Sequence, residues 1–324
     1  MFQIADYYGC THGTIVDRFK RFNLRSRGCL GLRRPINISK EKLDLLYTRP
    51  LSAKQIGHKF GFSKSGIEKK LKQFHIKTRG NLHKIQRKYK KFPFSGSLEE
   101  KSYLIGFRLG DLNVYHTNQV VVVRGSTTKP AQVKLIIGLF KSYGGIQTTM
   151  AKRGTLEQCA YLDRSFDFLL PKHDKIEHWI KTCPRCFLSF FAGYFDAEGC
   201  ITIHKNHSSN YSGFEIQSYD KNLLCESWQR LKKLNVNSPK PAISQYAGYI
   251  NKNGYMNNQD TWRVSIFAKK SVWQLLGYFE VLLRHGDKRK KLIQVKNNII
   301  ARNKMRRGRK VIKLTTIQLP QHNH

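Results

Sequence analysis

The sequence predicts an α+β fold in which two pseudo-symmetric αββαββα repeats follow small all-α modules. Two internal duplications lead to this prediction, one at an offset of 52 residues near the N-terminus and one at an offset of 87 residues in the larger part of the chain. In the larger part, stretches that alternate apolar and polar residues, as strands do, separate stretches of helical periodicity. A helical region followed by two mixed repeats is therefore expected.

The first duplication aligns residues 2–28 with residues 54–80 without a gap. In the second copy, Ser39 and Ser63 are suited to cap helices and Gly61 to end one, so the order is helix, helix, tight turn, helix. The first copy lacks the first of these helices, and we expect it to be the less stable copy. The helices expected in the second copy are residues 39–47, 51–60 and 63–74.

This order resembles tandem helix-turn-helix modules, whose last helix places its N-terminal residues on base edges in the DNA major groove. A pair of helical hairpins that binds protein is the alternative. The expected segments are a truncated module (1–30), a complete module (38–80) and a basic linker (81–95), which lies on DNA phosphates or is a solvated spacer. The residues expected to face bases are Lys64, Ser65 and Lys69 in the second copy and His12, Thr14 and Arg18 in the first.

The charge of the chain favours an acidic partner. Its 59 Lys and Arg residues outnumber 21 Asp and Glu residues, and the net charge of +38 is spread along the 324 residues rather than collected in one tail. A surface that follows a phosphate backbone through several modules explains this spread, and a ribosomal or chaperone-bound basic protein is the alternative. Because 40% of the residues are hydrophobic, the charge does not indicate disorder.

Membrane insertion and secretion are not expected. No stretch approaches the ~18 apolar residues of a membrane span, and the N-terminus lacks the order of a signal peptide. We expect an intracellular protein that is found with DNA, in the cytoplasm or nucleoid, or in an organelle matrix if organelle-encoded, and its seven cysteines then indicate reduced thiols. Cys183 and Cys186, with His178 upstream, have half the spacing of a zinc site, and a linker between repeats is the alternative.

The second duplication aligns residues 103–112 with residues 190–199. Both copies carry small residues four apart on one helical face, which lets two helices pack with their backbones close together. An acid follows in each copy, so Asp111 and Glu198 are expected side by side at helix C-termini, where the helix dipoles and their mutual repulsion oppose them. A divalent cation removes this objection, and Mg²⁺ binds through one or two carboxylates. The small residues are Gly106, Gly110, Gly193 and Ala197.

The same order of elements follows each acid. Four strands per half predict an antiparallel sheet with one face on helices and one free, polar face. The expected segments are a first repeat (96–182), a second repeat (187–303) and a basic tail (304–324). The predicted strands are 112–116, 119–123, 146–150, 156–162, 200–204, 214–219, 241–246 and 261–267, and the predicted helices are 130–143, 166–170, 175–180, 221–234 and 271–283.

The two motifs resemble those of LAGLIDADG homing endonucleases in their single-chain, two-motif form. The second motif, residues 191–199 (F-A-G-Y-F-D-A-E-G), is close to the family pattern. In the first motif, residues 104–112, Leu109 replaces the usual acid of the sixth place, Leu112 replaces the final Gly, and Arg108 adds a charge. The acid of the eighth place is present in both motifs, so the resemblance extends to the residues that matter most for the chemistry.

The resemblance implies a LAGLIDADG saddle on the DNA major groove, with Asp111 and Glu198 binding Mg²⁺ (or Mn²⁺) and cutting both strands across the minor groove. It implies a monomeric, site-specific double-strand DNA endonuclease that acts on a long, asymmetric target and serves the mobility of an intron or intein. A non-catalytic DNA-binding regulator and an intron RNA maturase use the same scaffold and are the alternatives. Helix-turn-helix modules favour duplex DNA, because a recognition helix fits the B-form major groove.

The resemblance also implies basic residues near the cut. Lys288 fits the active-site lysine by its position before the last helix, with the next two lysines or a solvated basic run as alternatives, and Lys172 is a weaker counterpart in the first half. Ser126 and Ser218 stand just before a helix where many family members have Gln. The DNA contacts expected from the free faces of the sheets are Arg124, Lys205, Gln217 and Arg263.

Overall fold

The protein is described by a computed structural model, which covers residues 2–24, 36–48, 51–76, 78, 90–117, 120–151, 154–206, 209–251, 254–304 and 311–321. The chain divides into two compact units, Met1–Gly80 and Asn81–His324. The end of the segment predicted to be a truncated module, most of the predicted linker and part of the predicted tail lie outside the described residues.

The first unit is helical, and the predicted helix cap Ser63 and helix end Gly61 are confirmed. Ser52 forms a capping box with Gln55, Ser63 accepts a hydrogen bond from the backbone of Gly66, and Gly61 ends a helix with a φ of 72°. A small core of fully buried residues, among them Leu43 and Ile67, closes the second copy. The helices are α1 (Phe2–Tyr7), α2 (His12–Arg21), α3 (Lys40–Thr48), α4 (Ala53–Phe60) and α5 (Lys64–Gln73).

The second unit contains two halves with the same order of elements, which confirms the predicted α+β class. In the first half these are α7 (Leu98–Asp111), β1 (Asn113–Thr117), β2 (Val120–Thr127), α8 (Pro130–Phe140), β3 (Gly145–Met150), β4 (Leu156–Leu162), the 3₁₀ helix η2 (Arg164–Leu169) and α9 (His178–Thr182). In the second half they are α10 (Pro184–Glu198), β5 (Gly199–Asn206), β6 (Ser209–Ser218), α11 (Lys221–Lys233), β7 (Ala242–Gln245), β8 (Thr261–Ile266), α12 (Lys269–Leu282) and α13 (Gly286–Lys304).

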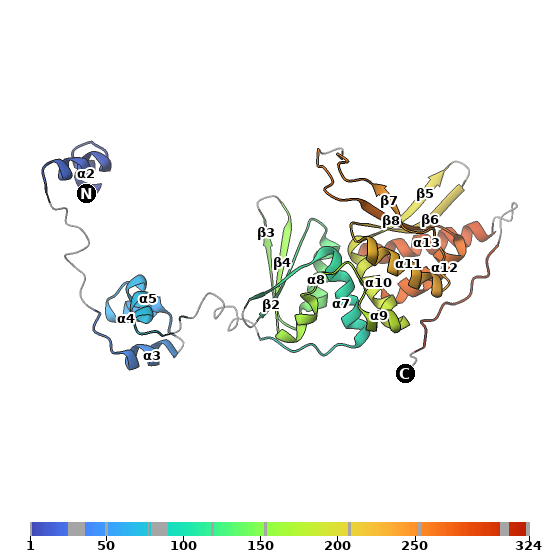
Figure 1. Ribbon diagram of the computed structural model, residues 1–324, viewed down its shortest axis with the longest axis horizontal. Coiled ribbons are helices and arrows are strands. Elements are labelled where there is room, and N and C mark those ends of the chain that lie inside the picture. Colours follow the sequence, from blue (N-terminus) through green and yellow to red (C-terminus); the bar gives the residue numbers. More distant parts are fainter. Residues whose placement is uncertain are drawn as a thin grey trace. The chain divides into compact units, whose positions relative to one another are not determined.

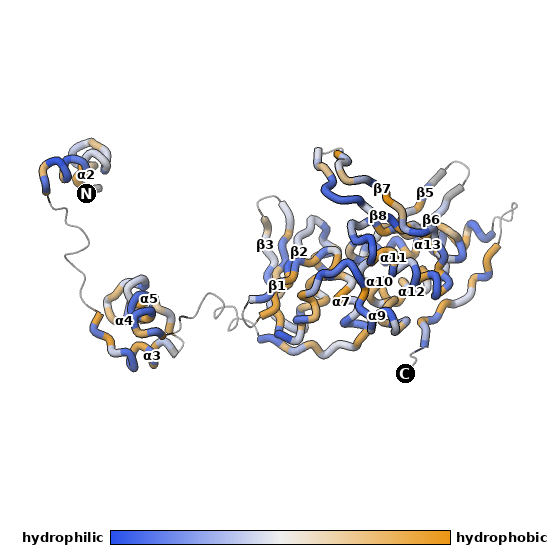
Figure 2. The backbone as a smooth tube through the Cα atoms, in the orientation of Figure 1, coloured by the Kyte–Doolittle hydropathy of each residue, from blue (hydrophilic) through white to orange (hydrophobic). Residues whose placement is uncertain are grey.

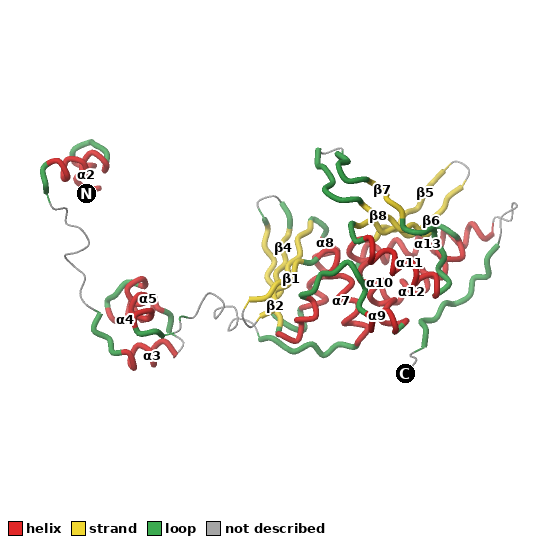
Figure 3. Tube along the Cα trace, in the orientation of Figure 1, coloured by secondary structure: helices red, strands yellow, loops and turns green. Residues whose placement is uncertain are grey.

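Each half forms a four-stranded antiparallel sheet, in the order β1-β2-β4-β3 in one and β5-β6-β8-β7 in the other (Figure 3). Val123 of β2 and its partner Ala160 of β4 are almost completely buried, whereas the next residue, Arg124, is exposed. Val120 and Val122, which lie on the same face as Arg124, are also buried, so the face away from the helices is polar only toward the end of β2. Figure 1 shows the helices of both halves gathered against the two sheets.

Helices α7 and α10 pack against each other through the small residues of the two motifs. A Cβ atom added to Gly106 would overlap the carbonyl oxygen of Phe190, and one added to Gly193 would overlap the carbonyl oxygen of Tyr103. The two contacts are reciprocal, so the helix pair has the pseudo-twofold relation expected from the duplication. In Figure 2 hydrophobic segments lie around α7, and residues of α7 belong to the buried core of this unit.

Two segments predicted to be a linker and a tail belong in part to the folded second unit. Phe94 packs in the core beside Phe166, and the backbone N–H of Phe92 donates to the carbonyl of Tyr143 at 2.9 Å. Residues 311–321 run back over α12, where the indole of Trp273 donates to the carbonyl of Thr315 at 2.9 Å. Apolar residues within these basic segments explain the difference, because they bury surface against the core.

Within the described part of the chain, no helix has both the length and the apolar character needed to cross a membrane.

Candidate active site

Asp111 and Glu198 are the last residues of α7 and α10, as the motifs predict. Each helix passes directly into the first strand of its half, so each carboxylate stands where a helix meets a sheet. The two ends come close together: a Cβ atom added to Gly110 would lie 3.0 Å from Oε1 of Glu198. Both acids keep an exposed surface and line one open cavity of about 550 Å³, which makes them accessible to a ligand.

Asp111 has neighbours that compensate its charge. The side-chain amide of Gln132, in the first turn of α8, donates a hydrogen bond to its Oδ2. Desolvation raises the pKa of Asp111, whereas this hydrogen bond and the positive charges of Lys288 and Lys129 lower it. The pKa of Asp111 therefore lies above its usual range, but its neighbours favour the ionised form.

Glu198 has a less favourable environment. Desolvation of its carboxylate, followed by the negative charges of Asp111 and Asp220, raises its pKa to about 7, while Lys172 and Lys288 lower it. Asp220 stands directly before α11 and accepts hydrogen bonds from the hydroxyls of Tyr194 and Ser218. Near neutral pH the site thus holds one carboxylate that resists ionisation, and a bound cation would relieve that cost.

Lys288 lies in the first turn of α13 rather than before the last helix, because α13 begins earlier than expected, at Gly286. Its ammonium donates to the carbonyls of Phe195 at 2.5 Å and Asp196 at 2.7 Å, near the end of α10. Desolvation lowers its pKa to about 8, against the opposing charges of Asp196 and Asp111. Lys172 is exposed, so the two lysines that the sequence singles out differ in how firmly they are held.

The sequence analysis assigned no role to several residues of this cavity, among them Gln132, Asp196 and His285. Ser126 and Ser218 stand where many members of the resembled family have Gln, and in the first half a glutamine lines the cavity from inside α8. Pro130, which marks the start of that helix, is the signal that would have located Gln132, since it lies two residues further on. Nothing in the local sequence marks His285, whose role depends on the contact between the two halves.

The donor set fits a divalent cation such as Mg²⁺ or Mn²⁺. Asp111 and Glu198 are hard oxygen ligands on the same cavity, and a bound cation would offset the desolvation and the repulsion from Asp111 and Asp220 that raise the pKa of Glu198. Among the described residues, no group of three or more His, Cys, Asp or Glu side chains is placed to hold a metal ion. A cation at these acids would therefore complete its shell with water or phosphate oxygens, as Mg²⁺ commonly does.

Apart from Lys205, the residues predicted to contact DNA have side chains that are exposed or partly exposed. Arg124 of β2 forms an ion pair with Glu157 at 3.4 Å, and Gln217 of β6 donates to Ser244 and pairs with Arg263 of β8 across the sheet. Lys205 lies in β5, but its side chain is outside the described residues. In the helical unit, Lys64, Ser65 and Lys69 lie in α5, with Lys64 paired to Glu68, and His12, Thr14 and Arg18 lie in α2.

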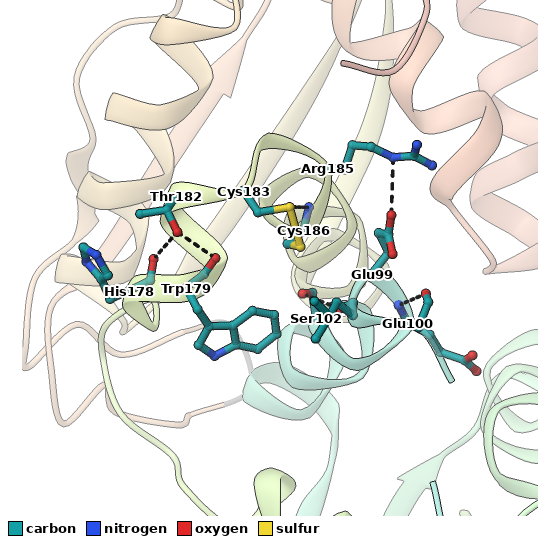
Figure 4. The surroundings of a disulfide bond; sticks show 11 residues. Glu99, Glu100, Ser102, His178, Trp179, Thr182, Cys183, Arg185 and Cys186 are labelled. Atoms are coloured by element: carbon teal, nitrogen blue, oxygen red, sulfur yellow. Dashed lines mark hydrogen bonds and ion pairs between the residues drawn. A yellow bond between two sulfur atoms is a disulfide. The ribbon is translucent and has the colours of Figure 1, made fainter. Parts of the chain in front are cut away.

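The prediction of reduced thiols is wrong for one pair of cysteines. Cys183 caps the N-terminus of α10 and forms a disulfide with Cys186 of the first turn, whose backbone N–H donates to the Cys183 sulfur (Figure 4). The Cα atoms of the two residues are 5.2 Å apart, which a helical turn after a cap readily provides. The pair thus lies at the start of helix α10 and not in a linker between the repeats. Among the described residues it belongs to no group of side chains that could hold a metal ion.

Residues 186–279 match a family model described as a LAGLIDADG-like domain. An uncharacterized protein of Methanocaldococcus jannaschii is 29% identical over 184 residues, which cover 53% of this chain and 63% of that protein, so the match spans less than two thirds of the relative.

Two solved structures are similar to parts of the chain at low identity. Full-length WhiA from Thermotoga maritima has a TM-score of 0.43 at 19% identity, over 68% of this chain and 64% of that one. The homing endonuclease I-DmoI, in complex with DNA and Mn, has a TM-score of 0.37 at 15% identity, over 57% of this chain and 97% of that one. Residues 186–279, the part that matches the LAGLIDADG-like model, run from the first turn of α10 through most of α12 in the second half of this unit.

Proposed function

We propose that the protein is a site-specific double-strand DNA endonuclease that requires Mg²⁺ or Mn²⁺. One observation carries the proposal: Asp111 and Glu198, from two helices that pack face to face, reach the same open cavity with raised carboxyl pKa values. A structural role does not explain two solvent-accessible acids that repel each other at helix C-termini. Binding of a divalent cation that also contacts a phosphate group would explain why the two acids lie there.

In this proposal each acid of the pair holds a cation against one scissile phosphate. The bound cation would supply an activated water and stabilise the charge that develops on the phosphate. Gln132 fixes the orientation of the Asp111 carboxylate through its hydrogen bond. Lys288 adds a positive charge that lines the same cavity. There it would stabilise the negative charge that develops on the phosphate in the transition state.

The rest of the molecule would bind the duplex. The polar faces of the two sheets, with Arg124, Gln217 and Arg263, are proposed to lie in the major groove on either side of the cut. The helical unit, with the exposed ends of α2 and α5, is proposed to bind a flanking segment and to lengthen the target. Since one chain carries both acids, the protein would act as a monomer on an asymmetric site, in the compartment that holds the DNA.

A non-catalytic regulator on the same scaffold is the second candidate, and the first motif favours it. Leu109 stands where the second motif has Asp196, and Arg108 adds a buried charge beside it. A regulator that does not cut DNA has no need to keep the metal-binding acids. Both acids are present here, which argues against the regulator. The endonuclease therefore explains more of the site than the regulator or the RNA maturase does.

The proposal is tested by incubating the purified protein with a partly randomised duplex library, with Mg²⁺ or with EDTA, and sequencing the ends. Discrete ends that require Mg²⁺ and disappear in Asp111→Asn and in Glu198→Gln would support the endonuclease and reveal its target. Enrichment of bound sequences without new ends, in protein shown to be folded, would overturn it in favour of the regulator.

The proposed role of the helical unit has its own test. Deleting residues 1–90 should weaken DNA binding and flatten its salt dependence by several phosphate contacts, because basic residues of that unit would no longer release counterions. Cleavage by the remaining unit should persist. An unchanged salt slope would place the helical unit off the DNA.

A further inference from the structure

We propose that Asp196 is a positioning residue that fixes the start of α13 and thereby holds Lys288 in the cavity beside Asp111. The contacts of Asp196 carry this inference, and they come from three different elements. Its importance for cleavage rests on the proposed function, whereas its effect on Lys288 does not.

The side chain of Asp196 is completely buried and acts as a junction between the two halves. Its Oδ2 accepts hydrogen bonds from the hydroxyl of Tyr103 on α7 at 2.6 Å, and from the backbone N–H groups of Arg284 at 2.7 Å and His285 at 3.2 Å. The guanidinium of Arg284 in turn lies 4.3 Å from the centre of the Tyr103 ring. The loop before α13 is thus tied to both interface helices through one carboxylate oxygen.

His285 connects this junction to the helix that carries Lys288. Its backbone N–H donates to Asp196, and its carbonyl accepts a hydrogen bond from the backbone N–H of Arg289 at 3.0 Å. This second bond lies in the first turn of α13. Lys288 lies in that turn and returns to the end of α10, where its ammonium donates to the carbonyl of Asp196 itself. The contacts form a closed ring, in which displacement of the loop would move the lysine.

The first half provides an internal comparison, because it lacks an acid at the matching place. Leu109 stands there, buried, and the neighbouring Arg108 donates instead to the carbonyls of Leu169 at 3.0 Å and Leu112 at 2.6 Å. A buried guanidinium that binds carbonyls replaces a buried carboxylate that binds N–H groups. The fold therefore does not require an acid at this place, and Asp196 serves something that the second half alone has.

The feature that only the second half has is a lysine, Lys288, that is held in place by hydrogen bonds. Burying a carboxylate is costly unless hydrogen bonds compensate it, and a leucine would fill the same place on the helix. In the first half the corresponding lysine, Lys172, is exposed, whereas Lys288 is half-buried and held by two carbonyls. The acid is found in the half where the lysine is held.

The test compares the reactivity of lysines toward an N-hydroxysuccinimide ester in full-length protein without metal or DNA, read by mass spectrometry. Exposed Lys290 is the internal reference. Asp196→Leu, which copies the first half, should raise the acylation rate of Lys288 about tenfold relative to Lys290, since the hydrogen bonds that fix the loop are lost. Asp196→Asn should stay near wild type, because its amide oxygen still accepts these bonds.

Two further variants keep the test decisive. Tyr103→Phe removes a hydrogen bond to the same oxygen without touching the loop, so Lys288 should stay protected. If Asp196→Leu does not fold, Arg284→Pro removes one of the two loop donors and leaves the acid in place, and it should also expose Lys288. Unchanged Lys288 reactivity in a folded Asp196→Leu or Arg284→Pro protein would overturn the inference.

Cleavage kinetics add a second readout. Asp196→Leu should slow single-turnover cleavage as much as Lys288→Met does, without weakening DNA binding, and the double variant should be no slower than Lys288→Met alone. Additive losses would overturn an action through the lysine. Absence of cleavage in the wild type would refute the endonuclease, and the acylation experiment would still decide whether Asp196 positions Lys288.

Discussion

Asp111 and Glu198 occupy the same place in the two halves, yet their neighbours carry opposite charge. The helix after the second strand begins beside Lys129 in the first half and beside Asp220 in the second. Gln132 supports Asp111, whereas Asp220 raises the pKa of Glu198. The duplication has kept the position of the acids and changed the electrostatics around them, so a symmetric fold does not imply two equivalent sites.

The contact between α7 and α10 shows the opposite behaviour. Gly106 and Gly193 meet each other's helix by the same backbone contact, in which no side chain fits. A backbone contact this close does not allow either glycine to be replaced by a larger residue. A charged residue at the rim of a cavity can be replaced without loss of the fold. The difference between the two regions leads to three predictions, given in order of expected effect.

The largest effect is expected at the helix contact. Gly106→Ala and Gly193→Ala should each destabilise the second unit by about 3 kcal/mol or more, and by similar amounts, because both added methyl groups overlap a carbonyl of the facing helix. Thermal unfolding followed by circular dichroism measures this. Gly138→Ala in α8 is the matched control: it has open space around its Cβ and should not destabilise. If either interface substitution lowered the free energy of unfolding only slightly, the two helix contacts would not be equivalent.

The lysines should differ in their effect on cleavage. Lys288→Met should slow single-turnover cleavage about 100-fold, because it removes a held charge from the cavity, whereas Lys172→Met should cost less than about tenfold. Strand-resolved gels on the recovered target would measure both rates. Equal losses would show that the exposed lysine is held as firmly on DNA as its counterpart, and would remove this part of the contrast between the halves.

The smallest effect is expected in the pH dependence of stability without metal. The raised pKa of Glu198 means that the unfolded chain ionises first as the pH rises from 4.5 to about 7, so stability falls across this window and stays lowered above it. Glu198→Gln removes this cost. Since the side chain is partly exposed, the variant should unfold only about 2 °C above wild type near pH 8, and equally with it near pH 4.

Asp111→Asn is the comparison for that experiment. Gln132 and the nearby lysines already favour ionised Asp111, so its substitution should raise the unfolding temperature less than Glu198→Gln does. A larger rise for Asp111→Asn would reverse the electrostatic contrast between the two halves.

The sequence alone predicted most of the fold and the position of the two acids of the candidate site at the ends of paired helices. Caps and alternation located nearly every helix and strand of the described chain, and the paired motifs located Asp111 and Glu198, because these signals are local. Gln132 and Asp196 were not assigned roles, since their partners lie far away in the chain. The cysteine disulfide and the packing of residues 311–321 were likewise missed, because composition suggested thiols and a basic tail.

Asp111 and Glu198 are proposed to hold a divalent cation together. Mn²⁺ titrated into the protein bound to its recovered target, with free Mn²⁺ followed by electron paramagnetic resonance, measures this binding. We expect the wild type to bind Mn²⁺ and both Asp111→Asn and Glu198→Gln to bind it at least about tenfold more weakly, with each variant folded. Wild-type Mn²⁺ affinity in both variants would contradict it, whatever the cleavage assays show.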